Sequence, residues 1–311
     1  MRKSAILYHR IDFDGICSYA IARESVELNS NIIGIPCSVT PFPWNRGDEL
    51  PALDGFDTVF VLDICLPVPV MKELSGKTHL VWVDHHATSI REMEDAGLGD
   101  LPGLRGTGVG ACELTWQLLR SYEKIPACVE LLSAYDVWDK ERFDWEGTTL
   151  AFQYGMRNRY GLDAEAFRKN FTDGRFALED GTDILSEGKA ILRYVRETGT
   201  NGARSYGFDV TVAGTMKGLA LLTDTGSSGP YEREALDRGA EVIVLLNRLG
   251  DKRNDSGTTL YKVSCFCPSG KPSVHLGEYL KDAYGGGGHE GAAGATLTEE
   301  QFFHILKTSR V

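Results

Sequence analysis

The chain has 311 residues, enough for two compact domains of roughly 150 residues each. Hydrophobic residues make up 42% and charged residues 25%, which is ordinary for a globular protein and excludes a disordered or fibrous chain. The net charge of −11 and the lack of Lys/Arg-rich runs argue against a protein that holds long nucleic acids, because such binding needs a basic surface.

Other features of the sequence indicate the compartment. No apolar run approaches the roughly 18 residues that a membrane span needs, so we expect no membrane contact. The start of the chain lacks the apolar region and the small-residue cleavage site of a secretory signal. The seven cysteines form no CxxC pair and mostly lie in apolar segments, which is typical of free thiols in a reducing compartment. We therefore expect a cytoplasmic protein.

The first half of the chain alternates apolar runs with amphipathic stretches. The runs are nearly continuous in Val, Ile and Leu, which is typical of strands covered on both faces. The predicted strands are 5–9, 32–37, 58–64 and 79–84, and the predicted helices are 15–28, 108–121 and 127–134. Strands that alternate with helices predict an α/β fold with a mostly parallel sheet.

The second half begins with a charged helical stretch and then returns to strands. Residues 163–198 have no strand-like run and predict a helical connector. Predicted strands follow at 208–213, 218–223, 242–247, 260–267 and 292–297, with helices at 274–283 and from Glu299 onward. We therefore predict a parallel-sheet catalytic domain at 1–160, a helical connector at 161–205 and a smaller mixed α/β domain at 206–311.

Acidic and histidine side chains follow three of the predicted strands in the first half. They are His9, Asp12 and Asp14 after the first strand, Asp63 at the end of the third, and Asp84, His85 and His86 at the end of the fourth. The carboxyl ends of parallel strands lie at one edge of a sheet, which is where ligands bind. A single Asp at such a position is more often a turn or helix cap, but capping alone does not explain three strand ends and a double His.

This concentration of charge predicts a metal site. Carboxylates that lie close together repel one another, and divalent cations remove that cost. A mixture of imidazole and carboxylate ligands favours Mn²⁺ or a similar first-row ion over Ca²⁺, and Mg²⁺ or Co²⁺ could replace it. Because five to six candidate ligands exceed the needs of one ion, we predict two divalent cations.

Several motifs resemble those of one known family. Val83-Asp84-His85-His86 resembles the signature of the DHH phosphoesterase superfamily. Residues 9–15 are similar to its first motif, residues 61–63 to its second, and residues 135–139, which contain Asp136, to its fourth. Residues 107–114 resemble the small-residue helix start that follows the signature. Residues 285–294 closely resemble the glycine-rich motif of the DHH-associated domain.

The resemblance implies a role for each of these residues. The residues that would hold one metal ion are His9, Asp12 and Asp63. Those that would hold the other are Asp14, Asp63, His85 and Asp136, with Asp63 bridging the two ions. His86 would contact the substrate phosphate, and Asp84 would orient His85 by accepting its other ring proton. A metal-bound hydroxide would then be the nucleophile, so the resemblance assigns catalysis to Asp63, Asp84 and His86.

The glycine-rich segment predicts a second group of substrate contacts, in a cleft between the domains. Successive backbone N–H groups can form an anion-binding nest, although four glycines are also typical of a turn. The candidate contacts are Gly286, Gly287, Gly288 and His289. The strand before the glycine-rich segment departs from the family pattern, because residues 263–269 lack the Arg-Ser pair that many members carry. Arg248, at the end of a predicted strand, is a candidate replacement.

Two other features stay open at this point. Trp116, Trp138 and Trp145 could stack on a base, but aromatic residues near helices more often belong to the core. Arg157 and Arg159 could lie in a solvated loop or form a phosphate clamp, and the sequence does not choose between these interpretations.

We therefore predict a nanoRNase-like two-metal phosphoesterase that hydrolyses short oligonucleotides, dinucleotides or small nucleotide phosphates. We expect no long nucleic acid as a partner, and the chain could act as a homodimer. An inorganic pyrophosphatase or polyphosphatase of the same superfamily is an alternative, although the basic motif that the resemblance associates with pyrophosphatases is missing. A non-catalytic nucleotide-binding regulator is another, but it would have lost metal ligands, and all the acidic ones are present.

Overall fold

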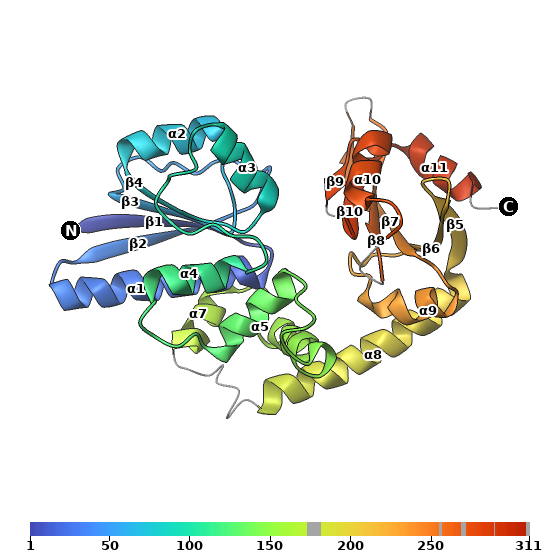
Figure 1. The fold of residues 1–311 in the computed structure, drawn as a ribbon, viewed down its shortest axis with the longest axis horizontal. Helices are drawn as coiled ribbons and strands as arrows, with labels where there is room; N and C mark the ends of the chain where they lie inside the picture. Colours follow the sequence, from blue (N-terminus) through green and yellow to red (C-terminus); the bar gives the residue numbers. More distant parts are fainter. Residues whose placement is uncertain (173–181, 255–256, 269–271, 289, 309–311) are drawn as a thin grey trace. The chain divides into compact units, whose positions relative to one another are not determined.

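The computed structural model describes the chain except for residues 173–181, 255–256, 269–271, 289 and 309–311. The chain forms two compact units, Met1–Leu192 and Arg193–Val311 (Figure 1). The division falls inside one long helix, α8 (Thr182–Tyr206). Each unit has its own sheet and its own hydrophobic core, as expected for separate domains.

The first unit is built on a sheet of four parallel strands in the order β2-β1-β3-β4. The strands are β1 (Arg2–His9), β2 (Cys37–Trp44), β3 (Thr58–Leu62) and β4 (His79–Val83). The predicted parallel α/β fold is therefore confirmed. Because all four strands run in the same direction, their carboxyl ends lie at one edge, and the residues that follow the strands meet there.

Both faces of this sheet are buried, which explains the continuous apolar runs of its strands. Ile6 and Tyr8 belong to the core cluster on one face, together with residues of α1, α4 and α5. Ala5 and Leu7 belong to the cluster on the other face, together with residues of α2 and α3 (Figure 1). The helices of this unit are α1 (Phe13–Ile33), α2 (Val68–Lys77), α3 (Ala87–Asp95), α4 (Ala111–Leu119), α5 (Ala127–Asp136), the π-helical turn Trp145–Leu150, α6 (Ala151–Tyr160) and α7 (Ala164–Thr172).

The predicted strand at 32–37 is wrong. Its first two residues, Ile32 and Ile33, form the exposed end of α1, which Gly34 caps in the left-handed conformation with φ 66°. The strand β2 begins only at Cys37, and two prolines at positions 41 and 43 concealed it in the sequence. Proline has no N–H to donate to a neighbouring strand. Because β2 lies at the edge of the sheet, it tolerates the two prolines. We also did not predict α2, α3 or α6.

The second unit is a mixed sheet of six strands in the order β5-β6-β7-β8-β10-β9. β6 and β7 are parallel and the other neighbours are antiparallel, which confirms the predicted mixed α/β fold. The strands are β5 (Phe208–Val212), β6 (Met216–Leu222), β7 (Val242–Arg253), β8 (Thr259–Phe266), β9 (Gly287–Gly288) and β10 (Ala292–Leu297). The helices after α8 are the short turn Gly229–Tyr231, α9 (Glu232–Asp237), α10 (Leu276–Tyr284) and α11 (Glu299–Thr308).

Residues of α10 and α11 share one core cluster with this sheet, and residues of α8 and α9 share another. The second sheet is thus also covered on two sides. Among the residues that the structure describes, no helix combines the length and the apolar character needed to cross a membrane.

The crossing of α6 and α8 gives a test of how closely the first unit is packed. A Cβ atom on Gly188 would lie 1.6 Å from the carbonyl oxygen of Ala151, and one on Gly155 would lie 2.1 Å from that of Ile184. We expect Gly188→Ala to destabilise the protein by about 1–3 kcal/mol, because the two helix backbones must move apart. A lower urea concentration at the midpoint of unfolding, followed by circular dichroism, measures the loss.

The matched control is Gly76→Ala, in α2, where an added Cβ meets no atom within 4 Å. This substitution should leave stability unchanged or raise it by up to about 1 kcal/mol, because alanine restricts the unfolded chain. Equal effects of the two substitutions would contradict the close crossing.

Candidate metal centre

The predicted acidic and histidine residues meet at the carboxyl edge of the first sheet. Three groups of side chains each place one ligand atom per residue within 4.8 Å of the others. The groups are His9, Asp12 and Asp63, then Asp14, His85 and Asp136, and finally Asp63, His85 and His86. The structure therefore brings together all six predicted metal ligands. Their roles as ligands stay a prediction, against which the local geometry can be compared.

His9 reaches the site although only two residues separate it from Asp12. Its Nδ1 atom lies 2.8 Å from Asp12 Oδ2 and 3.4 Å from Asp63 Oδ2. Asp12 also caps α1, because its Oδ1 accepts a hydrogen bond of 3.0 Å from the N–H of Gly15. A Cβ on Gly15 would lie 2.2 Å from the carbonyl oxygen of His9, so only glycine allows this close turn.

Asn45 is a site residue that the sequence analysis missed. Its Oδ1 lies 3.2 Å from Nε2 of His9 and so positions the imidazole from the side opposite Asp12. Asn45 directly follows β2, and Asp48 holds its turn by accepting from the N–H of Asn45 and from Arg10. The signal was present in the sequence as a polar residue after a strand, but the misplaced strand at 32–37 concealed it.

Asp14 is fixed by the N-terminus of α4. Its carboxylate accepts hydrogen bonds from the N–H groups of Ala111, at 2.7 Å, and Cys112, at 2.8 Å. Gly110 makes this approach possible, because a Cβ there would lie 2.8 Å from Ser133 Cα and 3.0 Å from Asp14 Oδ1. The small residues of the segment 107–114 thus have a structural purpose, which is to bring backbone donors onto a buried carboxylate.

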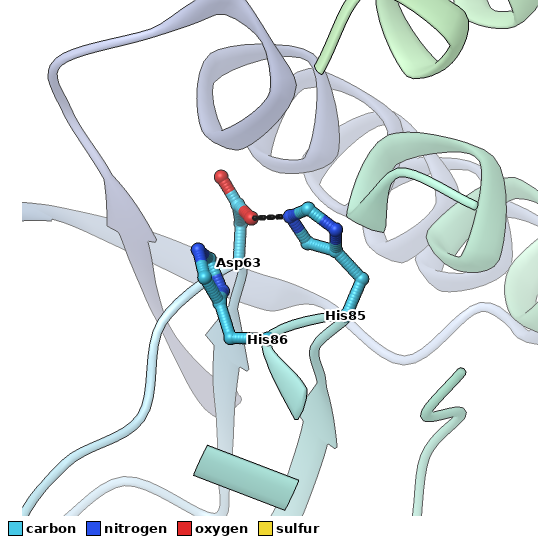
Figure 2. Close-up of side chains that lie close together, drawn as sticks. All are labelled: Asp63, His85 and His86. Atoms are coloured by element: carbon cyan, nitrogen blue, oxygen red, sulfur yellow. Dashed lines mark ion pairs between the residues drawn. The ribbon is translucent and has the colours of Figure 1, made fainter. Parts of the chain in front are cut away.

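Asp63 lies between the two histidines in a strained conformation. Its φ of 60° is in the left-handed region, which costs a residue other than glycine about 1–3 kcal/mol. Its N–H donates to the carbonyl of Val83, at 2.9 Å, and its side chain is only 1% exposed. Oδ2 of Asp63 lies 3.4 Å from His9 Nδ1. Its other oxygen, Oδ1, lies 3.3 Å from His85 Nε2 (Figure 2). This is the position of a bridging ligand.

The polar atoms of the site fit cations better than they fit one another. His85 Nε2 lies 3.0 Å from Asp136 Oδ2, 3.3 Å from Asp63 Oδ1 and 3.7 Å from Asp14 Oδ2. Even so, buried His85 Nε2, His9 Nδ1 and Asp63 Oδ1 have no aligned hydrogen-bond partner. Ligand atoms bound at about 2.1 Å to one ion lie about 3.0–3.4 Å from each other, and the distances found here, from 2.8 to 3.7 Å, span this range. The residues therefore fit two divalent cations.

Asp84 orients a different histidine from the one we expected. Its Oδ1 atom accepts from the N–H groups of His85, at 2.8 Å, and His86, at 3.1 Å, and lies 2.7 Å from His86 Nδ1. The expectation that Asp84 orients the ring of His85 is wrong, because its carboxylate folds back over the turn that follows β4. His86 is thus held through Nδ1, which leaves its Nε2 atom for the site.

The glycine-rich segment of the second unit is explained largely by packing. β9 pairs with β10, and a Cβ on Gly286 would lie 2.3 Å from the carbonyl oxygen of Gly294. The N–H of Gly286 already donates to Leu280, at 3.0 Å, at the end of α10, so it cannot serve as the predicted substrate donor. Gly287 and Gly288 stay candidates, whereas His289 lies outside the described residues.

The two arginine features are also placed by the structure. Arg248 lies exposed on β7, opposite Tyr261 of β8. Arg157 and Arg159 lie on α6 and not in a loop. Arg159 makes a two-pronged ion pair with Glu187, at 2.9 Å, and is therefore not a free phosphate clamp.

Comparison with known proteins identifies one domain of the chain and similar folds. Residues 228–310 match the family model described as the DHHA1 domain. The pGpG-specific phosphodiesterase PggH from Vibrio cholerae has a similar structure, with a TM-score of 0.53, 16% sequence identity, and 99% of this chain and 97% of that one covered. The DHH domain of a protein assigned to a family of ribosomal proteins is similar too, with a TM-score of 0.55, 14% identity and coverage of 99% and 85%. Among curated proteins, none matches the sequence.

Residues 228–310 thus form a DHHA1 domain, and the chain as a whole shares its fold with the two similar structures. The DHHA1 match lies within the second unit, and residues 84–86, which resemble the DHH signature, lie in the first. The two similar structures are 14–16% identical to this chain in sequence, so they establish the fold and not the chemistry of its site.

Burial and neighbouring charges together raise the pKa values of Asp14, His9 and His85. Burial raises the pKa of Asp14 well above its usual range, and the nearby charges of Asp63 and Asp136 add to this. Burial by itself lowers the pKa of His85, but the carboxylates of Asp136 and Asp63 outweigh it and raise that pKa to about 11. Asp12 and Asp63 likewise outweigh burial and raise the pKa of His9 to about 10. Without cations, these raised pKa values keep a proton on both imidazoles at neutral pH.

Metal binding should therefore release protons. A cation needs neutral imidazoles, so at pH 7.5 the binding of Mn²⁺ should displace protons from His9 and His85, about one from each. Titration calorimetry in two buffers with different ionisation enthalpies counts these protons. Because the protons are held below pH values of about 10 and 11, the apparent affinity for Mn²⁺ should rise as the pH is increased from 6 to 9. Equal heats in the two buffers would contradict this account of the site.

Proposed function

We propose that this protein is a DHH-type hydrolase of phosphate esters that works with two divalent cations. The position of Asp63 carries the proposal, because its two carboxylate oxygens face two separate ligand groups. We propose Mn²⁺ as the cation, since imidazole and carboxylate ligands suit first-row ions. Mg²⁺ or Co²⁺ are alternative cations for the same site. When bound, the two cations would lower the pKa of a water molecule and offset charge on the phosphate.

The residues of the chain itself would orient the substrate. Asp84 accepts from Nδ1 of His86 at 2.7 Å and outweighs burial to raise the pKa of that imidazole, so the protonated ring would donate from Nε2 to a phosphate oxygen. Asp14 is held at 2.7 Å by the N-terminus of α4 and would keep its group of ligands in place. Such fixed groups reduce the entropy lost when substrate and water are brought together.

We further propose that the substrate is small: a short oligonucleotide, a dinucleotide or a nucleotide with an additional phosphate. The net charge of −11 supports this, because long nucleic acids need many basic contacts that this chain lacks. One structurally similar protein is a pGpG-specific phosphodiesterase, so a linear dinucleotide is the first substrate to test. A small substrate also suits a site whose positive charge comes from cations in place of a basic surface.

Asp63→Asn tests the two-cation centre. The substitution removes a charge shared by both ligand groups, so hydrolysis of a dinucleotide should fall by several orders of magnitude. Chelation should abolish the activity of the unmodified protein, and added Mn²⁺ should restore it. The matched control is Asp95→Asn at the exposed end of α3, which should change the rate less than twofold. Full activity after exhaustive chelation would disprove the proposal.

A substrate panel tests the proposed specificity. With Mn²⁺ present, we expect release of mononucleotide or inorganic phosphate from linear dinucleotides, from RNA of a few residues, or from 3′,5′-bisphosphonucleosides. Rates on pyrophosphate, polyphosphate and a long single strand should be lower, as measured by chromatography of the products. Faster hydrolysis of pyrophosphate would favour the pyrophosphatase alternative, and faster hydrolysis of a long strand would favour an exonuclease.

A further inference from the structure

An aromatic stack lies at the end of α5, next to the predicted ligand Asp136. The rings of Tyr135 and Trp145 are stacked, with centroids 6.1 Å apart and planes 9° apart. Trp138 extends the stack, because its ring lies 5.7 Å from that of Trp145 with a tilt of 36°. Asp136 is the last residue of α5, and its carboxylate lies 3.0 Å from His85 Nε2. The stack and the metal centre are thus joined by a single helix end.

Trp138 occupies a position that usually belongs to glycine. Its N–H donates to the carbonyl of Tyr135, at 3.2 Å, and the N–H of Asp139 donates to that of Ala134, at 2.9 Å. These two bonds form the Schellman arrangement that ends a helix, in which one residue is left-handed. Trp138 is that residue, with φ 57°. Glycine adopts this conformation freely, whereas a bulky side chain does so at a cost that structures retain mainly at functional sites.

The side chain of Trp138 is also exposed. It is 49% accessible, whereas the rings of Trp44, Trp82 and Trp116 are buried in the core. The Nζ atom of Lys140 lies 5.1 Å from the centroid of Trp138 and 5.7 Å from that of Trp145, which adds a positive charge beside the rings. An exposed indole with a neighbouring ammonium group, close to an acidic cation site, offers the two contacts that a nucleotide needs: a flat apolar face and a cation.

We propose that Trp138 stacks on a nucleobase of the substrate whose phosphate is held at the metal centre, with Lys140 beside the same nucleotide. This inference rests on the proposed function and names a residue that selects nucleotides over other phosphate esters. Stacking tolerates any base, because every base has a π face. Trp138 therefore favours substrates that carry a base without choosing strongly among the four bases.

Trp138→Gly is the direct test, because glycine fits the left-handed position and the fold should survive. We expect KM for a linear dinucleotide to rise about 10- to 100-fold with little change in kcat, which corresponds to the loss of one stacked base. For the abasic counterpart of the same dinucleotide, KM should change less than twofold. Trp138→Phe should restore most of the affinity. The control Tyr122→Ala removes another exposed ring of the same unit and should leave KM unchanged for both substrates.

A binding measurement separates this inference from the proposed function. Titration of the Mn²⁺-loaded protein with adenosine monophosphate should quench tryptophan fluorescence, and Trp138→Gly should abolish the quenching. If the protein hydrolyses neither substrate, the proposed function fails, while the quenching still tests the stacking. Equal losses on the dinucleotide and the abasic substrate, or an unchanged KM in Trp138→Gly, would overturn the role of Trp138.

Discussion

Carboxylates held close together and out of water are the constraint on which the first unit depends. Asp14 and Asp63 are almost fully buried, and burial together with neighbouring carboxylates raises the pKa of both, which makes their ionisation costly. Positive charge must offset that cost, either as protons on His9 and His85 or as divalent cations in their place. The ligands are already assembled, so a cation would gain its binding energy without first ordering them.

The backbone around the site is shaped to hold these charges. A parallel sheet delivers residues from four strand ends to one edge, and the left-handed φ of Asp63 turns its carboxylate between two histidines. Gly15 and Gly110 remove the Cβ atoms that would keep the backbone of His9 and the start of α4 away. Strain of this kind persists only where surrounding packing determines it, and here both faces of the sheet are buried.

The end of α5 joins two properties that are usually supplied by separate elements. Asp136 closes the helix and faces His85, and Trp138, two residues later, presents an exposed ring from the capping position. A glycine there would end the helix at lower cost, so the tryptophan is best explained by what its side chain contacts. In the second unit the reverse holds for Gly286 and Gly288, because an added Cβ would lie 2.3 Å from the carbonyl oxygen of Gly294 and 2.5 Å from that of Ala292 in β10.

The sequence by itself determined the α/β class, the strand ends and most of the charged cluster, because apolar runs and the residues that follow them are local patterns. Tertiary structure decided what local patterns cannot contain. The exposed Ile32 and Ile33 look like a strand until α1 is seen to continue through them, and Asn45 joins the site only because β2 pairs with β1. Asp84 could orient either histidine, and only the fold of its turn selects His86. Likewise, the ring of Trp138 is exposed whereas those of Trp44, Trp82 and Trp116 are buried, and this difference is set by packing, which no short stretch of sequence records.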